Sequence, residues 1–385
     1  MENMKEDNYI EVNHEVLVWA RETIAMNRTN VTEKTTISAK RLIQLEEGEK
    51  QPTLEELKEL SKTYKRTIAT LLLTKPPKEK PLPTDRRTLD SNEIETLNEK
   101  TIMAIRKARA MVDSLVELKQ DAGITIPRFQ YKASIDDNPT LIANKLRQEL
   151  NLDEARQLEN INNALEVYIE KVESLGVAVF QLTLTHDQLR GFSMTDEIVP
   201  VIGIKRGQEK PTAKIFTLFH ELGHILLNDG GLCDLSENTN QQIEKWCNAF
   251  AAEILIPTTE LLEMNLVVEQ QSRGDKIWTL RSLIELANHF QVGPLAILRS
   301  LLVNDLTTPE YYKDRHQAWN KPTFGRSKKP EGRNIPKETI KEKGRTYVSL
   351  AFSAYDQNRI DLKDLSDFLG VKLSYIPQTR QLLNI

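Results

Sequence analysis

The spacing of apolar residues predicts a mainly helical chain. Apolar residues that recur every three or four positions indicate amphipathic helices, whereas alternation or short apolar runs indicate strands. Ser38 and Thr53 each precede a helical pattern and are good N-cap residues, and Thr53 is predicted to form a capping box with Glu56. Within residues 10–74, a first helix carries the stripe Val16, Leu17, Ala20 and Ile24, and further helices are expected at 32–37, 39–47, 54–64 and 68–73.

In the middle of the chain, the spacing of apolar residues changes from helical to strand-like over a short stretch. Helices are expected first at 93–121, 141–150 and 161–175. Three short segments then have strand character, at 177–180, 191–195 and 198–204. Helices resume at 215–227, 241–256, 258–266, 277–290 and 294–303, and helical periodicity returns within 344–385. A small sheet is therefore expected directly before the helix at 215–227.

Prolines divide the chain into segments. Residues 75–92 carry four prolines among charged residues, which predicts an extended linker. Residues 306–343 also contain four prolines and a basic run at 326–329, so a second linker is predicted there. The expected fold class is mainly α with α+β character: a helical bundle at 10–74, a domain with the small sheet at 93–305 and a helical segment at 344–385.

Composition narrows the class of protein. The chain has 385 residues, of which 28% are charged and 39% hydrophobic, as in an ordinary globular protein. A net charge of −4 gives no overall basic field that would attract nucleic acid. The two cysteines, Cys233 and Cys247, exclude a disulfide scaffold and suit a reducing compartment. The polar N-terminus does not look like a signal peptide, and no apolar stretch is long enough to cross a membrane, so we expect a cytoplasmic protein.

The segment His220–His224 has the pattern H-E-x-x-H inside the helix expected at 215–227. Residues four apart lie on one face of a helix, so both imidazoles can bind one metal ion. The spacing is typical of a zinc-binding helix in which the glutamate, here Glu221, is the general base. Gly223 costs the helix about 1 kcal/mol relative to alanine, and the close approach of a second helix would explain it.

Zinc needs a third protein ligand and an open position for water. The first candidate is Glu244, which lies 20 residues after His224 in the next strong helix. Asn248 follows one turn later and is expected to hold a ligand in place by hydrogen bonding. Cys247 is expected to be a small buried residue rather than a ligand. The rival candidates for the third ligand are Asp229, Asp234, Glu237 and Glu253.

This constellation predicts peptide-bond hydrolysis. Zinc lowers the pKa of a bound water to about 7 and polarises a carbonyl group. Glu221 is then expected to accept a proton from that water and pass it to a leaving amine. The other interpretation is that His220 and His224 are ordinary histidines on a helix surface.

The two helices together resemble the ImmA/IrrE family of metallo-endopeptidases. Residues 215–227 are similar to the family's catalytic helix, and 244–257 to its second helix, E-x-x-A-N-x-F-A-A-E-L-L-x-P. Cys247 stands where alanine is usual, and Lys205 stands where asparagine is common, so that strand end is expected to bind substrate differently. Further matches are 176–180 and 190–193. The resemblance covers about residues 145–305 and implies a zincin-like fold, with zinc bound by His220, His224 and Glu244.

Residues 39–53 resemble part of an XRE-type helix-turn-helix domain, which is often fused ahead of this peptidase. The resemblance implies an N-terminal helix-turn-helix bundle, in which Lys40, Arg41 and Gln44 suit base edges or phosphates. Through residue 77, however, the chain has 13 acidic and 12 basic residues, and Glu46 and Glu47 would repel a DNA backbone. DNA binding, recognition of a partner protein and dimerisation all stay open for this domain.

The resemblance also implies a function. A family member is expected to cleave a helix-turn-helix repressor and so release genes of a mobile element or a stress response. Two alternatives stay open: a DNA-binding regulator that uses the peptidase fold for sensing, and a protease effector of a toxin–antitoxin or defence system. The expected partners are a protein substrate and, as a second candidate, DNA; a homo-oligomer also stays open.

Overall fold

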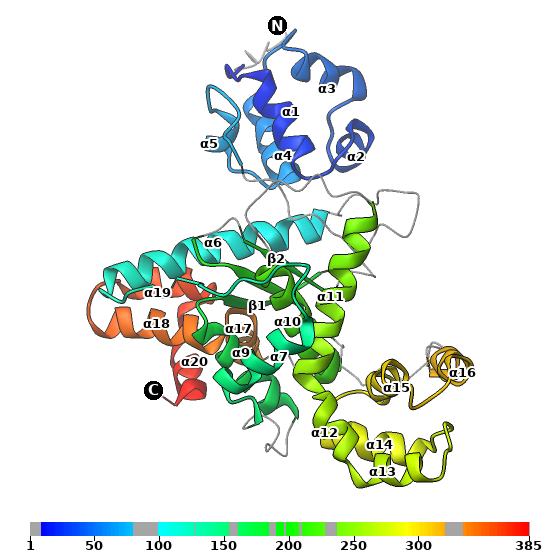
Figure 1. Cartoon of the computed structure of the whole chain (residues 1–385). Coiled ribbons are helices and arrows are strands. Elements are labelled where there is room, and N and C mark those ends of the chain that lie inside the picture. The colour runs from blue at the N-terminus through cyan, green and yellow to red at the C-terminus, as the bar shows by residue number, and fades with distance from the viewer. Residues whose placement is uncertain are drawn as a thin grey trace, which may run out of the picture. The chain divides into compact units, whose positions relative to one another are not determined.

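The computed structural model describes residues 9–79, 99–126, 128–153, 161–184, 190–195, 198–207, 210–227, 237–319 and 334–384. These residues form two compact units, one built from residues 9–79 and 99–106, the other from the described residues after 106 (Figure 1). The fold is mainly helical with one small sheet, so the predicted fold class is confirmed.

Short helices around a common core build the first unit. They are α1 (His14–Glu22), α2 (Arg28–Lys34), α3 (Ala39–Glu46), α4 (Leu54–Tyr64) and α5 (Ile68–Leu71), joined by the start of α6 (Glu99–Asp121). Ser38 and Thr53 cap α3 and α4 as predicted. The second helix differs from the prediction: it begins at Arg28 rather than at residue 32, because Asn27 and Asn30 form a capping box of their own.

Glu46 lies inside the first unit rather than on its surface. It is 3% exposed, and its carboxylate accepts hydrogen bonds from Nε of Arg21 at 2.6 Å and Nε of Arg28 at 2.7 Å. The expected repulsion between Glu46 and a DNA backbone is therefore wrong, because the charge is buried and paired.

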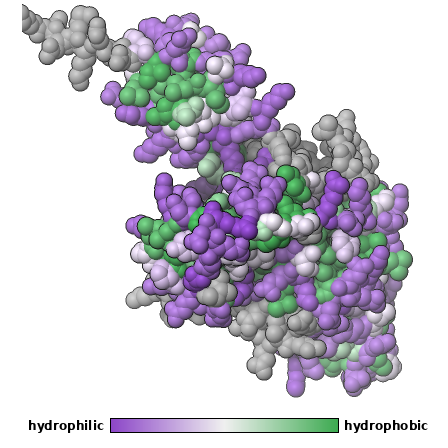
Figure 2. All heavy atoms as spheres, turned by 90° about the vertical axis from the view of Figure 1, so that its left-hand side faces the viewer, coloured by the Kyte–Doolittle hydropathy of each residue, from purple (hydrophilic) through white to green (hydrophobic). Residues whose placement is uncertain are grey.

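The surface of the first unit carries an apolar area. Figure 2 shows it as a group of hydrophobic side chains on an otherwise hydrophilic face. Among the described residues of this unit, the exposed large apolar side chains are Tyr9, Leu54, Leu72 and Leu73.

A three-stranded sheet lies at the centre of the second unit. Its strands are β1 (Ala178–Leu182), β2 (Gly191–Met194) and β3 (Val201–Lys205), in the order β1-β3-β2. β3 runs parallel to β1 and antiparallel to β2, so β2 is an edge strand. The third strand begins at Val201 rather than at residue 198, because residues 198–199 form a bend.

Both faces of this sheet are buried. Val179, Ile202 and Ile204 point to one face, where they share a core with α9 (Ile161–Ser174) and α10 (Pro211–Leu226). Phe180 points to the other face and meets the ring of Tyr347 in α18 (Arg345–Asp356), with centroids 6.4 Å apart. The sheet is therefore a middle layer between two helical layers.

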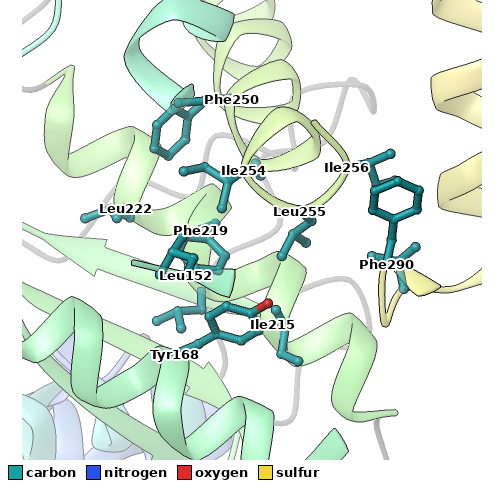
Figure 3. Packing of buried hydrophobic residues seen from close by; sticks show 14 of the residues in the cluster. Leu152, Tyr168, Ile215, Phe219, Leu222, Phe250, Ile254, Leu255, Ile256 and Phe290 are labelled. Carbon is teal, nitrogen blue, oxygen red and sulfur yellow. The ribbon is translucent and has the colours of Figure 1, made fainter. Parts of the chain in front are cut away.

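The main core joins α10 to α7 (Pro139–Leu150) and α11 (Glu237–Leu255). Figure 3 shows Phe219 of α10 and Phe250 and Ile254 of α11 within one apolar cluster. Tyr168 of α9 packs edge-on against Phe219, with ring centroids 5.4 Å apart. These contacts hold α10, and with it the H-E-x-x-H residues, against two other helices.

Helices continue to the end of the described chain. Two of them, α16 (Pro309–Trp319) and α17 (Ile335–Lys343), lie in the predicted linker 306–343, whose residues 320–333 lie outside the described residues. The prolines of this range predicted a linker, but Pro309 and Pro336 occupy the first turn of a helix, where proline costs no hydrogen bond. The others are α12 (Thr258–Glu263), α13 (Asn265–Ser272), α14 (Leu280–His289), α15 (Pro294–Val303), α19 (Leu362–Leu369), η2 (Leu373–Tyr375) and α20 (Ile376–Leu383).

Ion pairs fasten α17 beside the sheet. Arg206, directly after β3, lies 2.6 Å from the carboxylate of Glu338 and 3.0 Å from that of Glu342. Lys107 of α6 also pairs with Glu342. The C-terminal helices are thus part of the second unit.

Glu173, at the end of α9, is expected to make stability depend on pH. Burial raises its pKa to about 7, and a hydrogen bond from Thr346 only partly opposes this. Because the folded pKa exceeds the ordinary value, the protonated carboxyl of Glu173 favours the folded state. Its contribution to the free energy of unfolding is complete below about pH 4 and is lost as pH rises to about 7. Glu173→Gln is expected to reduce that loss by about 2 kcal/mol, measured as the free energy of unfolding in urea at pH 4.5 and pH 8.

The matched control is Glu166→Gln, an exposed residue on the same helix. This variant should keep the pH dependence of the unaltered chain. Equal pH profiles for both variants would contradict the assignment to Glu173.

Candidate metal centre

Close contact between two helices sets the frame of the site. A methyl group at Gly223 of α10 would lie 3.2 Å from Sγ and 3.3 Å from Cα of Cys247 in α11. This is the close approach that the glycine predicted. Cys247 is fully buried at the contact, as expected of a small apolar residue.

Three side chains converge where α10 and α11 meet. Nε2 of His220 and Nε2 of His224 are 3.1 Å apart. Glu244 places Oε2 3.3 Å from the first nitrogen and Oε1 3.2 Å from the second. In the described part of the chain, this is the group of His, Cys, Asp and Glu side chains close enough together to hold a metal ion.

The spacing of these atoms fits a zinc ion. Zinc lies about 2.0–2.1 Å from imidazole nitrogens and carboxylate oxygens, usually in a tetrahedron. Two ligand atoms of such a tetrahedron are about 3.3 Å apart. The separations of 3.1–3.3 Å, two of which are to different oxygens of Glu244, are of the size expected between neighbouring ligands of one tetrahedral ion.

Hydrogen bonding points to the same conclusion. Nδ1 of His220 lies 3.1 Å from Oδ1 of Asn248, and an amide oxygen only accepts. Nδ1 therefore carries a hydrogen, which leaves Nε2, the ring nitrogen that faces Glu244, as the atom that can bind a metal. Oε1 of Glu244 is buried without a hydrogen bond. A carboxylate and two imidazole nitrogens that face one another in a buried place suit a shared cation.

The charge of Glu244 suits a cation. Burial raises the pKa of its carboxyl, but attraction to the imidazoles of His220 and His224 outweighs this, so the pKa lies well below its usual range. The carboxylate is therefore ionised at neutral pH and offers a negative charge to whichever cation the histidines share.

Glu221 lies on the side of α10 that faces β2. It is 4% exposed. A methyl group at Gly191 would lie 3.2 Å from Cγ of Glu221 and 2.5 Å from Cγ2 of Thr217, so the strand can approach the helix here only because residue 191 is glycine. Glu221 thus lies beside the first residue of β2.

One side of β2 is a free edge in the part of the chain that the structure describes. The amide of Lys205 donates to the carbonyl of Arg190 at 2.8 Å. Hydrogen-bonded pairs alternate along an antiparallel ladder, so the N–H and C=O groups of Gly191 and Ser193 point away from β3. No strand among the described residues pairs with them. Such an edge can bind an extended peptide.

Sequence reasoning did not assign a role to this edge. Gly191 was the residue that could have indicated it, because a glycine inside a strand often marks the close approach of another segment. Which helix it would meet depends on the packing of distant segments.

Of the rival metal ligands, Glu253 is not brought to the site. Glu253 accepts hydrogen bonds from Thr258 and Asn144 at 2.7–3.2 Å, so it fastens the end of α11 instead. Asp229 and Asp234 lie outside the described residues, as does the side chain of Glu237.

The three residues predicted to contact DNA have different surroundings. Lys40 is exposed and Gln44 is partly buried. Arg41 is held within the first unit by the carboxylate of Glu56 at 2.7 and 2.8 Å and by the carbonyl of Gln51 at 2.9 Å. Arg41 would have to leave these partners to reach a base.

The range of the chain that contains the site matches a peptidase family. Residues 172–302 match the model of a peptidase family described as the IrrE N-terminal-like domain. The matched range contains the three strands, α10 and α11. It does not reach the first unit, so the helix-turn-helix resemblance stays a prediction. A search of curated proteins finds no match. No helix in the described ranges is long and apolar enough to cross a membrane.

Proposed function

We propose that this chain is a zinc-dependent endopeptidase. The observation that carries the proposal is the convergence of His220, His224 and Glu244, with ligand atoms 3.1–3.3 Å apart, inside the range that matches a peptidase family. In this proposal the three side chains hold zinc, and Asn248 orients His220 through its Nδ1 hydrogen. Zinc, when bound, would activate water and polarise the scissile carbonyl.

Glu221 is the proposed general base. Its carboxylate takes a proton from the attacking water and donates it to the nitrogen of the departing amine. Burial beside Gly191 and Thr217 supports this role, because the packing restricts where the side chain can go. Restricting the base in this way lowers the entropic cost of reaching the transition state.

The free edge of β2 supports cleavage within a chain rather than at its end. A substrate strand can pair its main chain with Gly191 and Ser193. Main-chain pairing requires no free terminus, and it favours an extended segment of the substrate. We therefore propose that the substrate is a protein that exposes an extended or locally unfolded segment.

A helix-turn-helix repressor is the proposed natural substrate. The support is the resemblance of the two metal-site helices to the ImmA/IrrE family. For the first unit, we propose contact with a partner protein rather than with DNA. Arg41 is held by Glu56, the surface carries an apolar area, and Leu72 and Leu73 are among the exposed apolar side chains of this unit.

Removal of metal tests the function. Incubation of the full chain with dipicolinate is expected to abolish cleavage of the helix-turn-helix repressor encoded nearest to its gene, and stoichiometric zinc is expected to restore it. Mass spectrometry of the products gives the cleaved bond. Magnesium serves as the control and should not restore cleavage, because imidazole ligands suit zinc and not magnesium. Cleavage that persists at full rate in the chelator would refute the proposal.

A further inference from the structure

We infer that Arg190 selects substrates with an acidic residue at the first or second position after the scissile bond. The inference rests on the proposed function. It adds a specificity-determining residue outside the metal centre, at the start of the edge strand.

The free edge gives the direction of a bound substrate. A peptide that joins β2 makes the more stable ladder when it runs antiparallel to that strand. The C-terminal part of the peptide then lies toward Arg190, and its N-terminal part toward Met194. Gly191 and Ser193 supply the main-chain groups that it pairs with.

The position of Glu221 fixes where along the edge cleavage occurs. Glu221 lies beside Gly191, so the scissile bond belongs to the substrate residue opposite Gly191. This residue comes either just before or just after the bond. The next residue toward the C-terminus lies opposite Arg190, and it is therefore the first or the second residue after the bond.

Side-chain alternation gives the face on which that residue meets Arg190. The Cβ direction of Gly191 points to Thr217 and Glu221 of α10. Neighbouring residues of a strand point to opposite faces of the sheet. The side chain of Arg190 and that of the substrate residue paired with it therefore both lie on the face away from α10. Directly opposite side chains on one face of an antiparallel pair lie close enough to interact.

The described residues around Arg190 offer it no counter-ion. Arg190 is exposed, and no carboxylate of the described residues pairs with it. Its neighbour across the sheet is a second cation, Lys205. Arg206, which follows Lys205, is itself bound to Glu338 and Glu342. A substrate carboxylate opposite Arg190 would supply the missing negative charge.

A cleavage survey of the full chain tests this inference. The probe is a mixture of peptides obtained by chymotryptic digestion of a bacterial lysate, incubated with the zinc-loaded protein and read by mass spectrometry. We expect aspartate and glutamate to be enriched at one position after the cleaved bond, by about 3- to 5-fold over glutamine and asparagine, as a partly exposed ion pair permits. Arg190→Glu should reverse the preference, so that lysine and arginine are enriched at the same position.

The control is Arg281→Glu, which makes the same charge change at an exposed site on α14. It should keep the acidic preference. Two synthetic peptides that differ only by Glu or Lys at the selected position then give kcat/KM for both enzymes. A reciprocal exchange of preference between them is not expected from a general loss of fold.

The outcomes separate this inference from the proposed function. Cleavage without an acidic preference, or a preference before the bond, would overturn the inference and leave the endopeptidase in place. An unchanged preference in Arg190→Glu would overturn it as well. Failure of the zinc-loaded chain to cleave any peptide would refute the proposed function, and the inference with it.

Discussion

Replacing Glu221 by glutamine is expected to lower the rate of peptide cleavage by about a thousandfold. The amide keeps the size of the side chain and its packing beside Gly191, but it cannot accept the proton of the attacking water. Zinc content should stay at the level of the unaltered chain, because Glu221 is not among the three converging ligands. The measurement is single-turnover cleavage together with metal analysis of the same sample.

The control for this variant is Glu263→Gln, which makes the same change at an exposed position of α12. It should cleave at the original rate. If Glu221→Gln cleaves equally fast, the general base is another group. If it loses zinc, Glu221 has a role in metal binding that the ligand geometry does not assign to it.

Replacing Glu244 by alanine is expected to weaken zinc binding by on the order of a thousandfold. Structural zinc sites with four ligands bind with about 10–16 kcal/mol, so one ligand corresponds to about 3–4 kcal/mol. The loss also leaves the two histidine nitrogens, 3.1 Å apart, without the carboxylate that holds their shared cation. Competition with a chromophoric chelator measures the affinity, and circular dichroism checks that the variant is folded.

Lys245→Ala is the matched control, since Lys245 is the exposed neighbour of Glu244 on the same helix. Its zinc affinity should not change. Full retention of zinc by Glu244→Ala would move the third ligand elsewhere in the chain, for example to Asp229 or Asp234.

Local periodicity predicted the parts of the site that one helix contains. The four-residue spacing of His220 and His224 places both on one face of α10, and Gly223 indicated a close second helix, which α11 provides. Glu244 and Asn248 were predictable because they share one face of that second helix and carry the right donor atoms. Both helices have strong apolar patterns, so their existence depended little on the rest of the fold.

Contacts between distant segments were not predictable in the same way. The approach of Gly191 to Glu221 depends on how an edge strand packs across a helix, and periodicity within either segment does not contain it. Arg41 suited DNA by residue type, but its bonds to Glu56 exist only because α3 and α4 pack together. The prolines of 306–343 are compatible with a linker and with the first turn of a helix, and only the surrounding structure distinguishes the two.

The packing of α17 and α18 against the sheet bears on how this chain can evolve or be divided. The family match ends at residue 302, yet Phe180 and Arg206, which lie within it, find their partners Tyr347, Glu338 and Glu342 beyond it. A fragment that stopped at the end of the match would expose one apolar face of its sheet to water and leave Arg206 without its carboxylates. The structural module is therefore longer than the matched range, and an exchange of the matched range alone would have to bring a compatible C-terminal layer with it.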